Sequence, residues 1–515
     1  MSTDRGGIRE TTPTRERAGP HASSPAHRSR RRWLFDAGGG LGGIALAHLL
    51  ARSGLLAGES APSGATRNAL AGGRTSALAT LDGGLHHRAR ARRVIQIFLN
   101  GGASQVDTFD PKPRLARDHG KRFDPGSGAR VESVTGSGDF RVLKSPFAFR
   151  RYGECGRWVS SVFPHIAGIV DRLAFLMSVT SPTNVHGLGS YFMNTGFTIP
   201  GFPCMGAWIS YGLGTLNEDL PTFVALPDAR GLPYNNRGNF TAGFLPARHE
   251  GTVIDLGAPS PIPHLAPPPN ARGITHRSEA DGRRLLRRLN RRFVEEHPGE
   301  SRLEARIASY ELAARLQLAA PELFDLSRES DATRRLYGVD EEPTREFGRR
   351  LLLARRMIER GVRFVQVWSG ASGPTNNWDN HANIETELPF MTRQVDLPAA
   401  GLILDLEARG LLDDTLVIWT TEFGRMPFGQ GQSGRDHNGG TFVVWLAGAG
   451  VRAGHAIGES DEWGWKAIEP ISVHDLHATI LWLLGIDHER LTVRHEGRDF
   501  RLTDVDGFVL RRILA

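Results

Sequence analysis

The sequence predicts an α/β fold in which a mainly parallel central sheet is covered by helices on both faces. The main observation is the alternation of amphipathic helical segments with short apolar runs between residues 345 and 485. Parallel strands need a long crossover connection, and this connection is usually a helix. The runs are also mainly apolar rather than strictly alternating, as expected for strands that are buried on both faces.

The folded body is predicted to begin with a buried strand at Arg93–Asn100. Two long helices follow from apolar residues at helical spacing, at Ser301–Ala319 and Arg345–Arg360. Pro321 ends the first helix, and Gly361 occupies the position where a C-terminal cap is expected.

The alternation then continues towards the C-terminus. It comprises a strand at Val362–Trp368, a helix at Pro398–Arg409, strands at Thr415–Thr420 and Thr441–Leu446, and a helix at His474–Leu484. Residues 227–275 are rich in Pro, Gly and Asn, which predicts long surface loops or an insertion. We find no internal repeat and no coiled-coil heptad.

The N-terminal segment resembles an export signal. The chain has a formal net charge of +7, yet residues 1–35 alone hold eight arginines against three acids. This segment ends in Ser-Arg-Arg-Arg-Trp-Leu-Phe (Ser29–Phe35), followed by an uncharged Gly/Ala/Leu-rich run at Ala37–Ala51 and small residues at 57–65. A charged region, a short apolar region and small residues make a secretory signal, and the paired arginines resemble the twin-arginine type. The alternative is a disordered basic tail followed by a helix.

The predicted domain organisation follows from these features. Residues 1–57 form the twin-arginine-type leader, residues 58–90 form an Ala/Gly/Ser/Arg-rich linker, and residues 91–515 form one α/β domain. We expect the twin-arginine export machinery as a partner, and a periplasmic or cell-surface location, with anchoring if the leader is not cleaved. We expect no nucleic-acid partner, because the basic arm that could bind one would be removed with the leader.

Two familiar kinds of site are not predicted. Gly38–Gly43 satisfies the G-x-G-x-x-G pattern, but no strand precedes it, so we reject a dinucleotide site. The chain has only two cysteines, Cys155 and Cys204, which could pair in an exported protein but make neither a disulfide framework nor a cysteine-based zinc site.

Acidic and imidazole side chains follow two of the predicted strands. Trp-Asp-Asn-His (Trp378–His381) comes after the strand at 362–368, and Glu422 follows the strand at 415–420 directly. His437 lies about one loop further on. Because parallel strands deliver their carboxyl ends to one edge of a sheet, Asp379, His381, Glu422 and His437 are the first candidates for metal ligands.

A series of motifs resembles the bacterial domain-of-unknown-function 1501 family, which is grouped with sulfatases and alkaline phosphatases. The motifs are Phe98–Lys112, His186-Gly187, Met193–Gly196, Met205–Trp208, Gly243–Pro246, Tyr310–Ala313, Glu422–Arg425, Gly434–His437, Val473–Thr479 and Gly497–Asp499. They occur in order over residues 91–515. The resemblance implies an alkaline-phosphatase-like version of the predicted α/β fold.

The resemblance also implies a divalent metal, with zinc, manganese or calcium as the candidates, and a substrate that is a phosphate or sulfate ester. Asp379 and His381 take the place of an Asp/His ligand pair, and His437 matches a downstream ligand. Asn100 lies where relatives carry an Asp, and Asp107 could serve in its place.

The sequence departs from the superfamily in two ways. Relatives carry Asp-His where this chain has Glu422-Phe423, which removes an imidazole. Relatives also place a nucleophilic Ser, Thr or Cys near the position that His186 occupies here. His186 is therefore the catalytic candidate, as a ligand, a general base or a phosphoryl acceptor.

Three further residues are candidates for binding the substrate. Arg425 and Arg435 could clamp an anionic ester, although each could equally form a salt bridge to Glu422 or Asp436. Ser104 follows the first strand at the edge of the site.

Together these observations predict an exported, metal-dependent hydrolase of phosphate or sulfate esters. The alternative is a secreted binding module that keeps the fold and a structural metal but has lost catalysis. Such a module would bind a polysaccharide, an envelope component or a protein.

Overall fold

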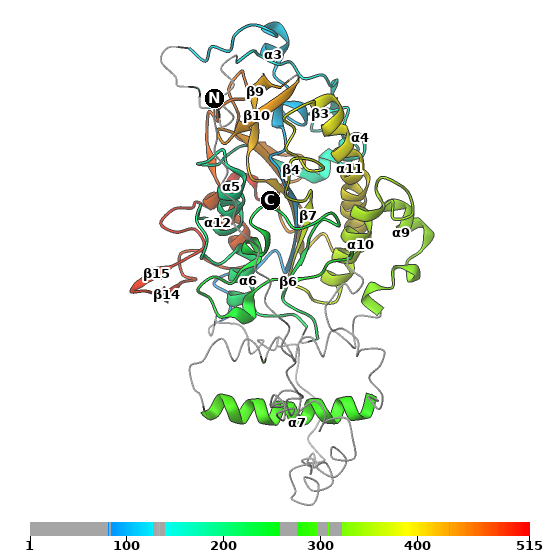
Figure 1. Cartoon of the computed structure of the whole chain (residues 1–515), viewed down its shortest axis with the longest axis vertical. Coiled ribbons are helices and arrows are strands. Elements are labelled where there is room, and N and C mark those ends of the chain that lie inside the picture. Colours follow the sequence, from blue (N-terminus) through cyan, green and yellow to red (C-terminus); the bar gives the residue numbers. More distant parts are fainter. Residues whose placement is uncertain are drawn as a thin grey trace, which may run out of the picture. The chain divides into compact units, whose positions relative to one another are not determined.

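The computed structural model of the chain describes residues 81, 84–126, 131, 133, 140–217, 219–257, 276–296, 307, 322–431 and 433–515 (Figure 1). The predicted leader lies outside these residues, and so does the predicted helix at 301–319 except for Ile307, which is helical. Contacts divide the chain into two compact units, 1–71 with 268–282 and 72–267 with 283–515. The fold below is that of the second unit.

A nine-stranded sheet forms the centre of this unit, in the order β12-β4-β11-β8-β1-β7-β5-β6, with β13 paired to β4. Its strands are β1 (Arg93–Leu99), β4 (Leu173–Thr180), β5 (Phe223–Leu226), β6 (Thr252–Val253), β7 (Phe364–Ser369), β8 (Thr415–Thr421), β11 (Phe442–Ala447), β12 (Ala456–Ile457) and β13 (Ile471–Ser472). β1 lies between β7 and β8 and is parallel to both. The mainly parallel sheet that the sequence predicts is therefore confirmed.

One strand, β11, runs against the others. It pairs antiparallel with β8 and with β4. The chain passes from β8 to β11 through the two-stranded sheet of β9 (Gly424–Gln430) and β10 (Gly434–Asn438), with no helix between them. Because no crossover helix carries the chain back along the sheet, β11 returns in the opposite direction.

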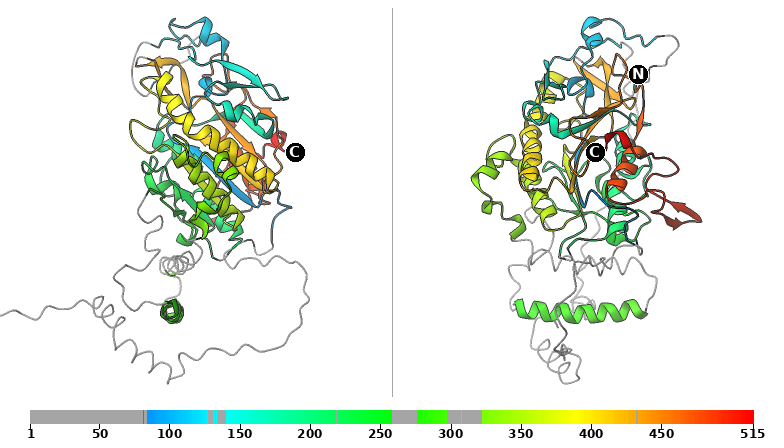
Figure 2. Two further views of the ribbon diagram at one scale, coloured as in Figure 1. Left: turned by 90° about the vertical axis from the view of Figure 1, so that its right-hand side faces the viewer. Right: turned by 180° about the vertical axis from the view of Figure 1, so that it is seen from behind.

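Helices cover both faces of the sheet (Figures 1 and 2). On one face, Ile95, Ile97 and Leu99 of β1 pack with α10 (Arg345–Glu359) and α11 (Ile384–Ala408). On the other face, Val94 and Phe98 pack with α5 (His186–Thr195), α6 (Met205–Leu213) and α12 (Val473–Leu483). Alternate side chains of a strand point to opposite faces, so a strand buried in this way is apolar on both sides.

Most predicted bounds are confirmed within one or two residues, but the helix predicted at 398–409 is wrong at its start. α11 begins at Ile384, where the side chain of Asn383 accepts a hydrogen bond from the backbone of Glu385. Pro389 and Pro398 both lie inside this helix. Pro398, the predicted first residue, is therefore an interior residue of this helix.

The remaining helices are α3 (Pro113–Arg117), α4 (Pro164–Ala167) and α9 (Asp331–Leu336), which are short, and α7 (His276–Glu296), which is long and has residues in both units. Turns of 3-10 helix occur at Gln105–Asp107, Val170–Arg172, Asn236–Phe240, Ala247–His249, Leu326–Arg328 and Arg511–Ile513. Two antiparallel pairs complete the fold, β2 (Phe149–Tyr152) with β3 (Arg157–Ser160) and β14 (Val493–His495) with β15 (Arg498–Phe500).

The segment predicted as loops, 227–275, is irregular as far as the structure describes it, apart from two 3-10 turns and β6. Cys155 and Cys204 are both free thiols. Within the described part of the chain, no helix combines the length and the apolar character needed to cross a membrane.

Candidate metal centre

The site forms where the central parallel strands end. β7 ends at Ser369 and leads into the loop that carries Asp379 and His381, and Glu422 is the residue after β8. His437 comes from β10, and His186 is the first residue of α5. Residues that are far apart in the chain therefore meet at the carboxyl edge of the sheet, as expected for an open α/β fold.

Two glycines make this close approach possible. Gly101, directly beyond β1, has φ +122°, and a Cβ there would lie 2.6 Å from the backbone nitrogen of Asp379. Gly434, at the start of β10, has no room for a Cβ beside the carbonyl group of His381. Any side chain at either position would push the Asp379–His381 loop away from the strand ends.

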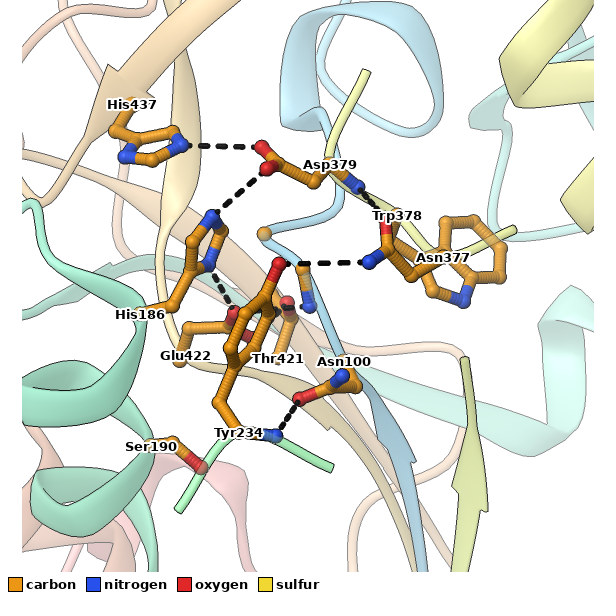
Figure 3. A network of polar contacts seen from close by, with 12 residues as sticks. Asn100, His186, Ser190, Tyr234, Asn377, Trp378, Asp379, Thr421, Glu422 and His437 are labelled. Atoms are coloured by element: carbon orange, nitrogen blue, oxygen red, sulfur yellow. Dashed lines mark hydrogen bonds and ion pairs between the residues drawn. The ribbon is translucent and has the colours of Figure 1, made fainter. Parts of the chain in front are cut away.

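Four side chains form a compact cluster, namely His186, Asp379, His381 and His437. Figure 3 shows three of them, His186, Asp379 and His437. One potential ligand atom from each lies within 4.8 Å of all the others. Asp379 Oδ1 is 2.7 Å from His381 Nε2 and 3.0 Å from His437 Nε2, and these two nitrogens are 2.7 Å apart. His186 Nε2 lies 3.2 Å from Asp379 Oδ2 but forms no hydrogen bond.

The outer nitrogen of each imidazole faces an oxygen acceptor. His186 Nδ1 is 2.7 Å from Glu422 Oε1, His437 Nδ1 is 2.7 Å from the Asn184 carbonyl oxygen, and His381 Nδ1 contacts Gln430 Oε1. Each Nδ1 therefore carries the proton, and each neutral ring presents the lone pair of Nε2 to the cluster.

This arrangement fits a bound cation. Two Nε2 lone pairs that face each other at 2.7 Å repel, and His186 Nε2 is buried without a hydrogen-bond partner. A positive ion among three imidazoles and one carboxylate would remove the repulsion and satisfy the lone pair. Outer hydrogen bonds that fix the tautomer are characteristic of metal-binding histidines.

The surroundings shift the pKa values of Asp379, His437 and His186 in different directions. Burial alone would raise the pKa of Asp379, but Arg425 and the contacts with the three histidines hold it well below its ordinary value. Burial lowers the pKa of His437 to about 4, and the contact with Asp379 offsets this only in part. Burial also acts to lower the pKa of His186, but the contacts with Asp379 and Glu422 outweigh it and leave this pKa raised.

Glu422 lies outside the cluster, although the sequence predicted it as a ligand. Its Oε1 accepts hydrogen bonds from His186 Nδ1 at 2.7 Å and from the backbone nitrogen of Gly101 at 2.8 Å, and Oε2 contacts Thr421 Oγ1. The described geometry thus places His186 in the cluster and Glu422 behind it.

The two predicted substrate-binding arginines are fully buried and saturated. Arg425 Nη2 is 2.6 Å from Asp379 Oδ1, and the three guanidinium nitrogens together donate to four backbone carbonyl groups. Arg435 forms a bidentate ion pair with Asp107, at 2.6 and 3.1 Å. Both form salt bridges, as the alternative interpretation held, but with different partners from Glu422 and Asp436.

The other predicted residues lie at the edge of the site. Asp107 is occupied by Arg435 and by Ser104 Oγ, so neither Asp107 nor Ser104 faces the cluster. Asn100 Oδ1 accepts from the backbone of Tyr234 at 3.4 Å, while its buried Nδ2 has no hydrogen-bond partner among the described residues.

Three contributing residues were not predicted from the sequence. The ring of Tyr234 stacks on His186 with centroids 4.4 Å apart, and burial together with the charges of Asp379 and Glu422 raises the pKa of Tyr234 to about 12. Phe423 packs against the rings of His186 and His437, where relatives are expected to carry a ligand. Gln430 holds His381. These residues lie in loops and in a hairpin, and no local pattern marks them.

A pocket of about 290 Å³ opens beside Asp379. It is lined by residues 374–377, Asp379 and Asn380, and by Thr386, Glu387 and Phe390 at the start of α11. Most of these side chains are neutral and polar. Asp379 is the member of the cluster that lines this pocket.

Residues 91–514 match the family described as "Protein of unknown function (DUF1501)". The chain belongs to this family. The match covers the body that the sequence predicted as one domain, and it confirms the resemblance carried by the motifs. No curated protein sequence matches the chain.

Among solved structures, the chain is similar to the PsFucS1 sulfatase from Pseudoalteromonas sp., with 13% identity over 77% of this chain and 68% of that chain and a TM-score of 0.32. It is similar to the lipoteichoic acid synthase LtaP from Listeria monocytogenes, with 10% identity over 80% and 76% and a TM-score of 0.34. It is also similar to an alkaline phosphatase from the Antarctic bacterium TAB5, with 11% identity over 76% and 98% and a TM-score of 0.29. At these scores the likeness is one of general architecture, so no function is carried over from it.

Proposed function

We propose that this member of the DUF1501 family is a metal-dependent hydrolase of phosphate or sulfate esters. The observation that carries the proposal is the convergence of three Nε2 lone pairs and one carboxylate oxygen on a single point. Imidazole nitrogens favour zinc and other late transition metals over calcium, which prefers oxygen ligands.

The distances suggest how the four residues divide the work. Asp379, His381 and His437 are the tightest trio, with contacts of 2.7 to 3.0 Å, and would hold the ion. Three protein ligands leave a position open for water or substrate, as catalytic metal sites require. When bound, the ion would polarise the ester oxygens and lower the pKa of a coordinated water.

His186 would then move the proton. Glu422 keeps a proton on His186 Nδ1, so proton exchange takes place at Nε2, which faces Asp379 and has no hydrogen-bond partner. Tyr234 covers the ring of His186 and fixes its orientation. Arg425 holds Asp379 and keeps it ionised for the metal.

The nucleophile in this proposal is water. His186 occupies the position where the resemblance to the superfamily places a Ser, Thr or Cys nucleophile. Because Arg425 and Arg435 are saturated, the charge that develops on the ester would be met by the metal and His186.

One observation favours the binding module instead. If His186 also binds the metal, four protein ligands close a tetrahedral site, which is the form that structural zinc sites take. Phe423, which packs against both His186 and His437, would then seal a site that has no open position.

One variant separates the two functions. We expect the zinc- or manganese-loaded protein to hydrolyse p-nitrophenyl phosphate or p-nitrophenyl sulfate, and His186→Ala to lose turnover by about 10²-fold or more while keeping its metal. His165→Ala, which alters an exposed histidine, is the control. A wild type that binds metal but turns over neither ester, together with loss of metal from His186→Ala, would establish the binding module.

The location belongs to the proposal as well. The Arg-rich segment and the apolar run that follows it support export by the twin-arginine machinery, with residues 1–57 as leader and 58–90 as linker. We expect Arg30→Lys/Arg31→Lys to keep the protein in the cytoplasm of a bacterial host, whereas the wild type reaches the periplasm. Cell fractionation measures this, and equal export of both proteins would contradict it.

A further inference from the structure

α7 (His276–Glu296) is a continuous helix of 21 residues with one apolar side (Figure 1). Leu286, Leu289 and Phe293 are spaced by three and four residues, which places them within about 60° of one another around the helix axis. Their relative exposures are 49%, 57% and 45%. Exposed large apolar side chains in a row at helical spacing mark an interaction surface rather than chance.

The opposite side of the same helix is rich in arginine. The segment 276–296 contains seven arginines and four acids, and Arg284, Arg288, Arg291 and Arg292 are exposed. At about 100° per residue these four arginines lie more than about 90° from Leu286 on the helix circumference. Arg292 forms an ion pair of 2.9 Å with Glu296, and the helix keeps a net positive charge.

We propose that α7 lies flat in the headgroup region of an anionic phospholipid bilayer. Leu286 and Leu289 would enter the boundary with the acyl chains, and the arginines would face lipid phosphates. A helix with a highly charged face, a Leu/Phe face and low overall hydrophobicity has the composition of an interfacial helix and not of a spanning one.

The two sides of the helix together select this partner over two others. A nucleic acid would attract the arginines but would leave the leucines in water. An apolar groove in a protein would cover the leucines but would not by itself need four exposed arginines. A bilayer that contains anionic lipid satisfies both sides at once, because phosphates lie directly above the acyl region. The inference is independent of the metal centre and of the proposed hydrolase.

The test is vesicle co-sedimentation of the full chain. Vesicles of phosphatidylcholine alone are compared with vesicles that contain about 30% phosphatidylglycerol, at about 0.1 M and 0.5 M salt. The key variant is Leu286→Ser/Leu289→Ser, which keeps every charge of α7 and of the N-terminal arginines. The matched control is Ile199→Ser/Ile468→Ser, which removes two exposed apolar side chains from other parts of the surface.

We expect the wild type and the control to bind the anionic vesicles equally, and the leucine variant to bind at least tenfold more weakly. A second variant, Arg288→Gln/Arg291→Gln, keeps good helix formers at both positions and should lose most of the salt-sensitive binding. Circular dichroism checks that each variant is folded.

Three results would overturn the proposal. One is wild-type binding by the leucine variant, which would assign binding to the leader. Another is equal binding to neutral and anionic vesicles. The third is tighter binding to double-stranded DNA than to vesicles at the same salt, with no effect of the leucine substitutions.

Discussion

Glu422 offers the sharpest test of how the centre is organised. Its Oε1 accepts from both His186 Nδ1 and the backbone nitrogen of Gly101. In Glu422→Gln, the Gly101 donor requires an oxygen at the same place, so the amide oxygen stays towards His186 and the tautomer is kept. The substitution therefore removes the negative charge and little else.

The expected magnitude follows from the kind of hydrogen bond that is weakened. A hydrogen bond to a charged group contributes about 1.5–3 kcal/mol, against about 1 kcal/mol for a neutral one. The difference is about 0.5–2 kcal/mol, so if His186 uses that stabilisation in the transition state, Glu422→Gln lowers kcat by about 2- to 30-fold. Metal content and metal affinity stay unchanged, because Glu422 contacts no member of the cluster except His186.

The assay measures kcat on the two p-nitrophenyl esters and metal content on the same samples. Glu385→Gln, which neutralises an exposed acid in the first turn of α11, is the matched control and should behave as the wild type. Unchanged kcat in folded Glu422→Gln would refute the role given to the carboxylate. Complete loss of metal would show that Glu422 is itself a ligand.

Further predictions concern stability and packing. Burial lowers the pKa of His249 to about 4, so the folded state binds fewer protons than the unfolded state at acidic pH. The free energy of unfolding should therefore fall by about 2 kcal/mol as the pH drops from about 7 to about 4.5. His249→Gln should remove this part of the loss, as measured by urea unfolding at both pH values. Asp107→Asn leaves Arg435 buried without its partner and should cost about 3–5 kcal/mol in the same unfolding measurement, with the metal retained in the protein that stays folded. Gly101→Ala should displace the loop of Asp379 and lower metal affinity by at least about tenfold in a chelator competition, because its Cβ meets the loop backbone; wild-type affinity would contradict this.

Much of the fold could be predicted because it depends on local patterns. Runs such as Leu416–Trp419 are apolar throughout, and α10 combines helical spacing with Gly361 at its C-terminal end. The direction of β11 could not be predicted, because an inserted hairpin replaces the crossover helix and no local pattern reports it. The start of α11 was missed because proline occurs both at the first position of a helix and, less often, inside one, and the sequence alone does not distinguish the two positions.

The sequence indicated which residues lie near one another at the site better than it indicated what each of them contacts. Asp379, His381 and His437 do meet at the strand ends, as parallel topology requires. Which of Glu422 and His186 faces inwards depends on the angle at which α5 enters, and this is set by packing between distant segments. For the same reason Arg435 was assigned to the substrate, although it is buried against Asp107.

The central claim is that Asp379, His381 and His437 hold a divalent cation. The most direct measurement is metal stoichiometry, by elemental mass spectrometry, on the full chain and on the Asp379→Ala/His437→Ala double variant after incubation with zinc or manganese. We expect about one ion per wild-type chain and less than about a tenth of that in the folded double variant. A wild type without metal, or a double variant that keeps it, would contradict the account.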